Sequence, residues 1–141
     1  MSREHLEKAK MLLDKTGSTC VLCGDDVIIT DKRRGIKPLL DLLDGAGNVS
    51  RFSAADKVVG KAAAFLYCLL EIKDLFAKVI SQPALDVLRS VGISVEYEEL
   101  VPAIKNRAGD GYCPMETAVW NISDPDNALI AIRDTLFHLS K

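Results

Sequence analysis

Two lysines near the middle of the chain carry the clearest chemical signal in the sequence. Lys57 and Lys61 are four residues apart, and the residues from 62 to 70 that follow them carry no charge. In a helix, side chains four residues apart share one face, and an ammonium group at the core must find a carboxylate, an anion or water. Asp56 and Gly60 belong to the same motif, because glycine inside a helix indicates a close approach to the backbone. We expect these four residues to bind a ligand; the alternative is that both lysines extend to water and that Asp56 only caps the helix.

The second signal is a glycine-containing loop that leads into a helix. Asn106 and Arg107 begin the loop, and Cys113 precedes Pro114, a residue type favoured in the first turn of a helix. The positive end of a helix lowers the pKa of a thiol and attracts anions. Cys113 is therefore a candidate nucleophile, and Asn106, Arg107 and Glu116 are candidate ligand-binding residues. The alternative is an ordinary helix start with a small buried cysteine.

A third cluster is the basic stretch from residue 31 to residue 38, which leads into another helix. Such a stretch can bind phosphate or carboxylate. Lys32 and Arg33 are expected to lie in a solvated turn, so Arg34 is the residue of this cluster that joins the candidate ligand-binding set.

The sequence contains no familiar metal site. Cys20 and Cys23 have the spacing of half a zinc knuckle, but no second pair of this kind exists and neither His5 nor His138 is near them. Residues three apart in a strand point to opposite faces, so the pair is not expected to bind metal. Walker, G-x-G-x-x-G, G-x-S-x-G and H-E-x-x-H motifs are also missing from the sequence. We predict no metal and no cofactor.

The composition is that of a globular protein. The chain has 141 residues, of which 48% are hydrophobic and 27% are charged, and its net charge is −2. This predicts one domain over residues 1–141. Because charges of both signs are mixed, no nucleic-acid partner is expected. With a polar N-terminus, no long apolar run and four cysteines in apolar contexts, the chain is expected to be cytoplasmic, with free thiols and no membrane partner.

The elements that must position the candidate residues alternate between helices and strands. A hairpin is predicted around Gly24, and residues 54–72 are predicted to form one buried helix with Ser53 as its N-cap, because apolar residues surround it. The predicted order is helix 4–14, strands 19–22 and 27–30, helices 36–43 and 54–72, strand 76–81, helix 83–91, strand 93–97, a helix opened by Pro114, and helix 125–139. This order predicts the α/β class, with a three-layer α/β/α sandwich and a mixed sheet.

Three segments make the chain recognisable. Residues 34–40, residues 55–64, and the Asn106-Arg107 and Cys113-Pro114-Met115-Glu116 motifs resemble the prokaryotic domain-of-unknown-function family numbered eighteen ninety-three. The resemblance extends over residues 6–121, and it implies a cytidine-deaminase-like fold.

The zinc motifs of that fold are not preserved. Zinc deaminases begin one helix with His-x-Glu and another with Pro-Cys-x-x-Cys, where this chain offers Asp56-Lys57-Val58 and Cys113-Pro114-Met115-Glu116. Lys57 and Lys61 would bring two ammonium groups beside a dication, and each unit-charge contact near 4 Å is worth about 4 kcal/mol at an effective dielectric constant of about 20. The comparison implies that lysine charge replaces zinc and pairs with Glu116 or Asp56. Hydrolytic deamination is then expected to be absent, since it needs metal-activated water.

Three functions fit these observations. The favoured one is a module that binds a small anionic or nucleotide-like ligand between two helix N-termini, through the lysines and the Asn-Arg pair. The second is a metal-independent enzyme with Cys113 as nucleophile, for which no histidine base is available. The third is a structural or interaction domain in which lysine and carboxylate side chains form a buried ion-pair network. A homodimer is compatible with each.

Overall fold

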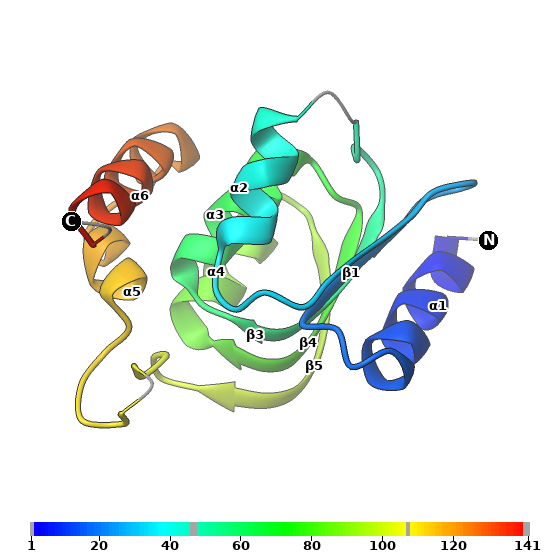
Figure 1. Ribbon diagram of the computed structural model, residues 1–141, viewed down its shortest axis with the longest axis horizontal. Coiled ribbons are helices and arrows are strands. Elements are labelled where there is room, and N and C mark those ends of the chain that lie inside the picture. The colour runs from blue at the N-terminus through cyan, green and yellow to red at the C-terminus, as the bar shows by residue number, and fades with distance from the viewer. Residues whose placement is uncertain (1, 46–47, 107, 140–141) are drawn as a thin grey trace.

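The protein is built around a mixed five-stranded sheet with helices on both of its faces (Figure 1). The computed structural model describes residues 2–45, 48–106 and 108–139. One helix covers one face of the sheet, three helices cover the other, and the last two helices pack outside those three. This arrangement confirms the predicted three-layer α/β/α sandwich.

The strands follow the order β2-β1-β3-β4-β5. β1 (Cys20–Cys23) pairs antiparallel with β2 (Ile28–Asp31) and with β3 (Ser53–Val59). β3 pairs parallel with β4 (Asp74–Ser81), and β4 pairs parallel with β5 (Ser94–Val101). The carboxyl ends of β3, β4 and β5 therefore lie along one edge of the sheet.

The helices divide into an inner set and an outer pair. They are α1 (Ser2–Lys15), α2 (Lys37–Asp44), α3 (Lys61–Leu70), α4 (Gln82–Ser90), α5 (Pro114–Val119) and α6 (Pro125–Leu139). α1 alone covers one face, where Leu6, Ala9 and Leu13 form a separate apolar cluster with Val21 and Phe76. The larger core lies on the other face, beneath α2, α3 and α4, and α5 and α6 pack against α3.

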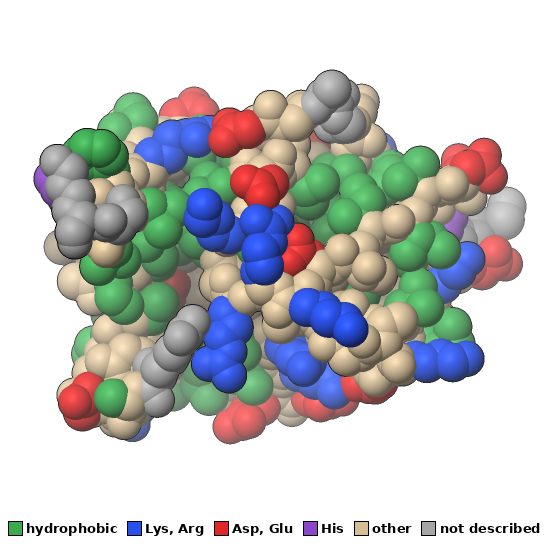
Figure 2. All heavy atoms as spheres, viewed as in Figure 1, with side chains coloured by type: hydrophobic (Ala, Val, Ile, Leu, Met, Phe, Trp, Pro, Cys, Tyr) green, Lys and Arg blue, Asp and Glu red, His purple; other side chains and the backbone are tan. Residues whose placement is uncertain are grey.

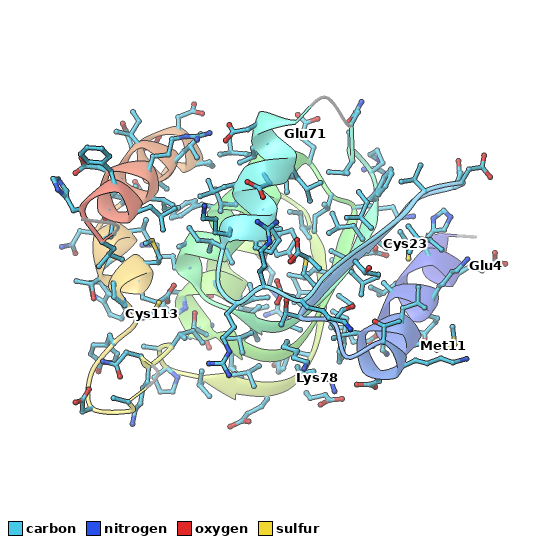
Figure 3. The ribbon with its side chains drawn as sticks, in the orientation of Figure 1. Glu4, Met11, Cys23, Glu71, Lys78 and Cys113 are labelled. Carbon is cyan, nitrogen blue, oxygen red and sulfur yellow. The ribbon has the colours of Figure 1, made fainter. Side chains whose placement is uncertain are left out.

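Ion pairs reinforce the contact between α1 and the sheet. The Lys10 ammonium pairs with Glu96 of β5 and lies over the ring of Phe76. One turn further along the helix, Lys78 of β4, labelled in Figure 3, pairs with Asp14. Elsewhere on the surface, the face in Figure 2 shows lysine and arginine side chains interspersed with carboxylates. None of the helices in the described part of the chain is both long enough and apolar enough to cross a membrane.

The prediction of one long helix over residues 54–72 is wrong. The structure has β3 and α3 there, joined at Gly60, whose backbone is extended (φ −96°, ψ −179°). Ser53, the predicted N-cap, is instead a fully buried strand residue. A strand that is covered on both faces is apolar on both sides, so its pattern cannot be distinguished from that of a buried helix. The described sheet therefore has five strands, where the sequence pattern predicted four.

The end of α3 allows a simple test of local backbone strain. Glu71 has left-handed backbone angles (φ 59°, ψ 39°), and its N–H donates to the Cys68 carbonyl. Glycine adopts these angles without the Cβ clash. Glu71→Gly is therefore expected to raise the free energy of unfolding by about 0.5–1 kcal/mol, measured by urea denaturation. Glu71→Ala is the control, because it removes the carboxylate and keeps the strain; equal stability of the two variants would contradict the explanation.

Candidate functional site

The amino end of α3 is completed by a side chain from a different helix. Its N-cap residue, Gly60, has no side chain to cap the helix, and the backbone N–H of Ala62 donates to Glu116 Oε1 of α5 at 3.2 Å. A Cβ atom on Gly60 would lie 2.2 Å from this oxygen. The prediction that something approaches Gly60 closely is therefore correct, although the glycine lies before the helix rather than within it.

Glu116 is almost completely buried, with 2% of its surface exposed. Its Oε2 atom has no hydrogen-bond partner among the described residues. Burial raises the pKa of Glu116, while the N–H groups at the start of α3 and the charge of Lys61 act in the opposite direction. The carboxyl group thus occupies the positive end of α3, and it takes the place that an external anion would need there.

Lys61, the first residue of α3, lies beside this carboxyl group. Its Nζ atom donates a hydrogen bond to the carbonyl oxygen of Trp120 at 2.9 Å and lies 5.7 Å from the centre of the Phe65 ring. Burial lowers the pKa of Lys61, and the nearby charge of Glu116 partly offsets this effect. The predicted pairing of a lysine with Glu116 is therefore present as an electrostatic attraction between Lys61 and Glu116. The hydrogen bond of Lys61 is made to the backbone carbonyl of Trp120 instead.

Lys61 also faces an open groove of about 600 Å³. One wall comes from α3 and the α5–α6 connection, and the other comes from α4 and the segment after β5. The lining residues are Lys61, Gln82, Pro83, Asp86, Val87, Ser90, Pro102, Trp120, Ile122 and Ser123. Three of the segments that form it directly follow β3, β4 and β5, so the groove lies at the carboxyl edge of the parallel strands, where open α/β sheets bind ligands.

The second predicted lysine takes no part in the groove. Lys57 lies in β3, is exposed, and belongs to a different element from Lys61, so the two do not share a helix face. The expectation that both lysines point into one cleft is wrong for Lys57. This error has the same cause as the wrong helix prediction, because Lys57 and Lys61 would share a face only if residues 54–72 formed one continuous helix.

Asp56 has a different partner from the one predicted. Its Oδ2 atom accepts a hydrogen bond from the Tyr67 hydroxyl at 2.6 Å, and this hydroxyl lies 3.4 Å from the sulfur of Cys20. Burial raises the pKa of Asp56 to about 7, while the hydrogen bonds from Tyr67 and from the backbone of Val58 act to lower it. Sequence reasoning missed Tyr67 and Cys20, because this contact requires β1, β3 and α3 to be placed correctly.

The described residues of the Asn-Arg loop do not line the groove. The side-chain oxygen of Asn106 accepts from the Gly109 N–H at 2.9 Å, and its nitrogen donates to Asp110 at 3.0 Å, so Asn106 orders its own loop. Arg107 lies outside the described residues. Within the described part of the loop, Tyr112 contacts a groove residue, because its ring stacks on Trp120 with a centroid separation of 6.1 Å.

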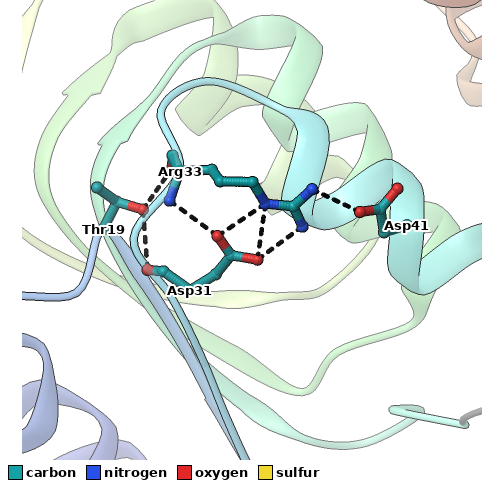
Figure 4. Close-up of polar contacts among 4 residues, drawn as sticks. All are labelled: Thr19, Asp31, Arg33 and Asp41. Atoms are coloured by element: carbon teal, nitrogen blue, oxygen red, sulfur yellow. Dashed lines mark hydrogen bonds and ion pairs between the residues drawn. The ribbon is translucent and has the colours of Figure 1, made fainter.

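In the basic stretch after β2, Arg33 is paired with neighbouring carboxylates. Figure 4 shows the Arg33 guanidinium between two carboxylates, with 2.7 Å separations to Asp31 and to Asp41. Thr19 fixes this turn by donating to the Arg33 carbonyl at 2.6 Å. Arg34 is exposed and does not line the groove, so the structure does not bring it to the other candidate residues.

Cys113 and its surroundings do not fit a zinc site of the deaminase kind. Cys113 is the N-cap of α5 and is half-buried, and Figure 3 shows it far from Cys23, which lies beneath α1. Glu116 is already bonded to the Ala62 N–H, and the Lys61 ammonium lies beside it. In the described ranges, no three His, Cys, Asp or Glu side chains come together as a metal-binding group.

Comparisons with known proteins agree with the family resemblance. The family model described as "TM1506: Domain of unknown function (DUF1893)" matches residues 8–136. The crystal structure of a DUF1893 family protein (TM1506) from Thermotoga maritima is 30% identical, with a TM-score of 0.85, over 96% of this chain and 90% of that chain. A dCMP deaminase from the cyanophage S-TIM5, in its apo form, is 10% identical with a TM-score of 0.45, over 68% of this chain and 95% of that chain. No protein with a curated description matches the chain.

Proposed function

The chain belongs to the DUF1893 family, and we propose that it binds a small anionic or nucleotide-like ligand in the groove beside Lys61. The observation that carries this proposal is the position of the Lys61 ammonium, at the wall of an open groove at the carboxyl edge of the parallel strands. Sites at this edge are the common ligand sites of open α/β sheets.

The hydrogen-bonding capacity of Lys61 supports an anionic ligand. An ammonium group has three N–H donors, and the hydrogen bond to the Trp120 carbonyl uses one of them. That bond holds the side chain in place, so an arriving anion does not have to order it. The Glu116 carboxyl group occupies the end of α3, which leaves Lys61 rather than the helix terminus as the anion-binding group.

The walls of the groove support a ligand that also has a flat apolar part. Trp120 is 46% exposed, and it lines the groove together with Ile122, Pro83 and Val87. An exposed indole ring offers a face on which a planar ring can stack. Because Tyr112 stacks on Trp120, the ring is also restricted in its motion before any ligand arrives.

A charge-removing substitution tests the proposal. Lys61→Met keeps the apolar stem and removes the ammonium group, so it is expected to weaken binding of the best ligand by about tenfold, the usual scale for losing one charged hydrogen bond. Binding is measured by titration calorimetry with nucleoside monophosphates, inorganic phosphate and benzoate. Lys57→Met is the matched control, because Lys57 is an exposed lysine outside the groove, and it should leave the affinity unchanged.

The same variant separates ligand binding from a purely structural role. The hydrogen bond between Lys61 and Trp120 ties α3 to the end of α5, which is the observation that favours a structural domain. In that case Lys61→Met would change the free energy of unfolding, and none of the anions would bind to the wild-type protein. Failure of all the anions to bind the wild-type protein would therefore reject the proposal.

Several sequence predictions remain untested by the fold. All four cysteines are free thiols, which is compatible with the proposed cytoplasmic location. A homodimer, and the expectation that neither nucleic acid nor membrane is a partner, stay predictions. Among the described residues, no contact favours Cys113 as a nucleophile over its position as a helix N-cap.

A further inference from the structure

Among the described residues, the charged ones that line the groove are one base and one acid. Lys61 lies on the wall formed by α3 and the α5–α6 connection, and Asp86 lies on the wall formed by α4. The neutral polar side chains in the described part of the lining are Gln82, Ser90 and Ser123. A ligand that carried only negative charge would approach Lys61 favourably and Asp86 unfavourably.

The α4 wall presents its polar groups as one row. Gln82, Asp86 and Ser90 are spaced four residues apart, so they lie on the same face of the helix, and all three line the groove. Their spacing places acceptors over about two turns, or roughly 11 Å, along the groove. The row therefore runs along the groove rather than marking a single point.

This row is rich in hydrogen-bond acceptors. The side-chain N–H of Gln82 donates a hydrogen bond to Asp86 Oδ1 at 2.9 Å, which leaves the side-chain carbonyl oxygen of Gln82 as an acceptor. The Ser90 hydroxyl donates to the Val87 carbonyl at 2.7 Å, so its oxygen can only accept a further bond. A carboxylate has about four acceptor positions, so Asp86 can accept more hydrogen bonds than the one from Gln82. The opposite wall has the Lys61 ammonium, which is a donor only.

We infer that the ligand of the groove is dipolar, with an anionic group that binds Lys61 and an ammonium group that binds the Asp86 row. An apolar middle part would contact Trp120, Val87 and Ile122, which line the same groove. The chemical class is a small amino-carboxylate zwitterion. This inference rests on the proposed function, since it requires that the groove binds an anionic group at Lys61.

Three compounds that differ only at one end test the inference. 4-(Aminomethyl)benzoate carries both charges on a flat apolar ring, whereas 4-methylbenzoate and 4-(acetamidomethyl)benzoate carry only the carboxylate. Titration calorimetry at low ionic strength should show the zwitterion binding about tenfold tighter than the two anions. Asp86→Asn should remove this preference, and the affinity for 4-methylbenzoate should rise slightly, because the repulsion between its carboxylate and Asp86 is gone. Asp126→Asn, which changes an exposed acid of α6 outside the groove lining, is the matched control and should keep the preference.

The outcomes distinguish this inference from the proposed function. Equal binding of the three compounds, with a loss in Lys61→Met, would overturn the dipolar ligand and leave the anion site intact. A preference for the zwitterion that survives Asp86→Asn would also overturn it, as would binding of nucleoside monophosphates without any binding of the zwitterion. Failure of every anion and of the zwitterion would reject both.

Discussion

Replacing Gly60 with alanine is expected to lower the free energy of unfolding by about 3 kcal/mol, the upper part of the usual range for overpacking a buried site. The new Cβ would lie 2.2 Å from Glu116 Oε1 and 2.6 Å from the carboxyl carbon. Glu116 is buried and bonded to the Ala62 N–H, so it cannot move aside without leaving the end of α3 uncapped. Urea denaturation with the midpoint and the slope both reported measures the effect.

A double-mutant cycle identifies the cause of this loss. Glu116→Ala alone removes the cap and should cost about 1–2 kcal/mol. In the Gly60→Ala/Glu116→Ala protein the clash is gone, so its loss should be smaller than the sum of the two single losses by at least about 1 kcal/mol. Gly111→Ala, whose Cβ would be 3.4 Å from an Asn106 side-chain atom, is the control for glycine replacement. Additive losses would show that the Glu116 carboxyl group is not what requires glycine here.

Asp56→Asn is expected to make the protein more stable at pH 8, and to make its stability less dependent on pH between the ordinary pKa of 3.8 and the folded pKa of about 7. The pKa of Asp56 is about 7 in the folded protein, above its ordinary value of 3.8. Below the ordinary value the carboxyl group is protonated in both states and has no effect. As the pH rises towards 7, the unfolded chain releases this proton first, so stability falls, and above 7 the full cost is present.

The shift sets the size of this effect. At about 1.4 kcal/mol per pKa unit the upper limit is about 4 kcal/mol, and since Asp56 is only partly buried we expect roughly 2–4 kcal/mol. The asparagine oxygen can still accept from the Tyr67 hydroxyl. The effect is measured by comparing the unfolding free energies of the wild-type protein and of Asp56→Asn at several pH values. Burial also raises the pKa of Glu116, so the unfolding free energy of Asp56→Asn should still depend partly on pH. Glu116→Gln identifies the part of this dependence that Glu116 contributes. Parallel pH profiles of Asp56→Asn and the wild-type protein would refute the explanation.

Local sequence patterns predicted most of the elements, because turn and helix-start signals lie within a few residues of one another. The hairpin around Gly24 and the helix after Ser81 follow from such signals, and the structure has both. The prediction for residues 54–72 failed because the first three residues of β3 are all buried, so the start of the strand lacks the alternation of a half-exposed strand. In this stretch, Gly60 was the one residue that indicated a change from strand to helix.

The sequence predicted only part of the candidate site. Lys61 and Glu116 were both singled out, and the structure brings them together at the end of α3. Lys57 and Asn106 lie elsewhere, since their expected positions depended on the continuous helix and on a loop that the structure folds back on itself. Arg34 also lies elsewhere, exposed in the segment after β2. The α4 wall was missed entirely, although polar residues four apart directly after a strand are a recognisable signal.

The contact between Glu116 and Ala62 joins positions 54 residues apart in the chain. The start of α3 is therefore left incomplete until α5 docks, and the centre of the protein depends on its last third for cooperative folding. During synthesis, the core around α3 would gain its final hydrogen bond late, after the C-terminal helices have formed. Exchange of the Ala62 amide proton with solvent should accordingly follow the undocking of α5 rather than fraying of α3 itself.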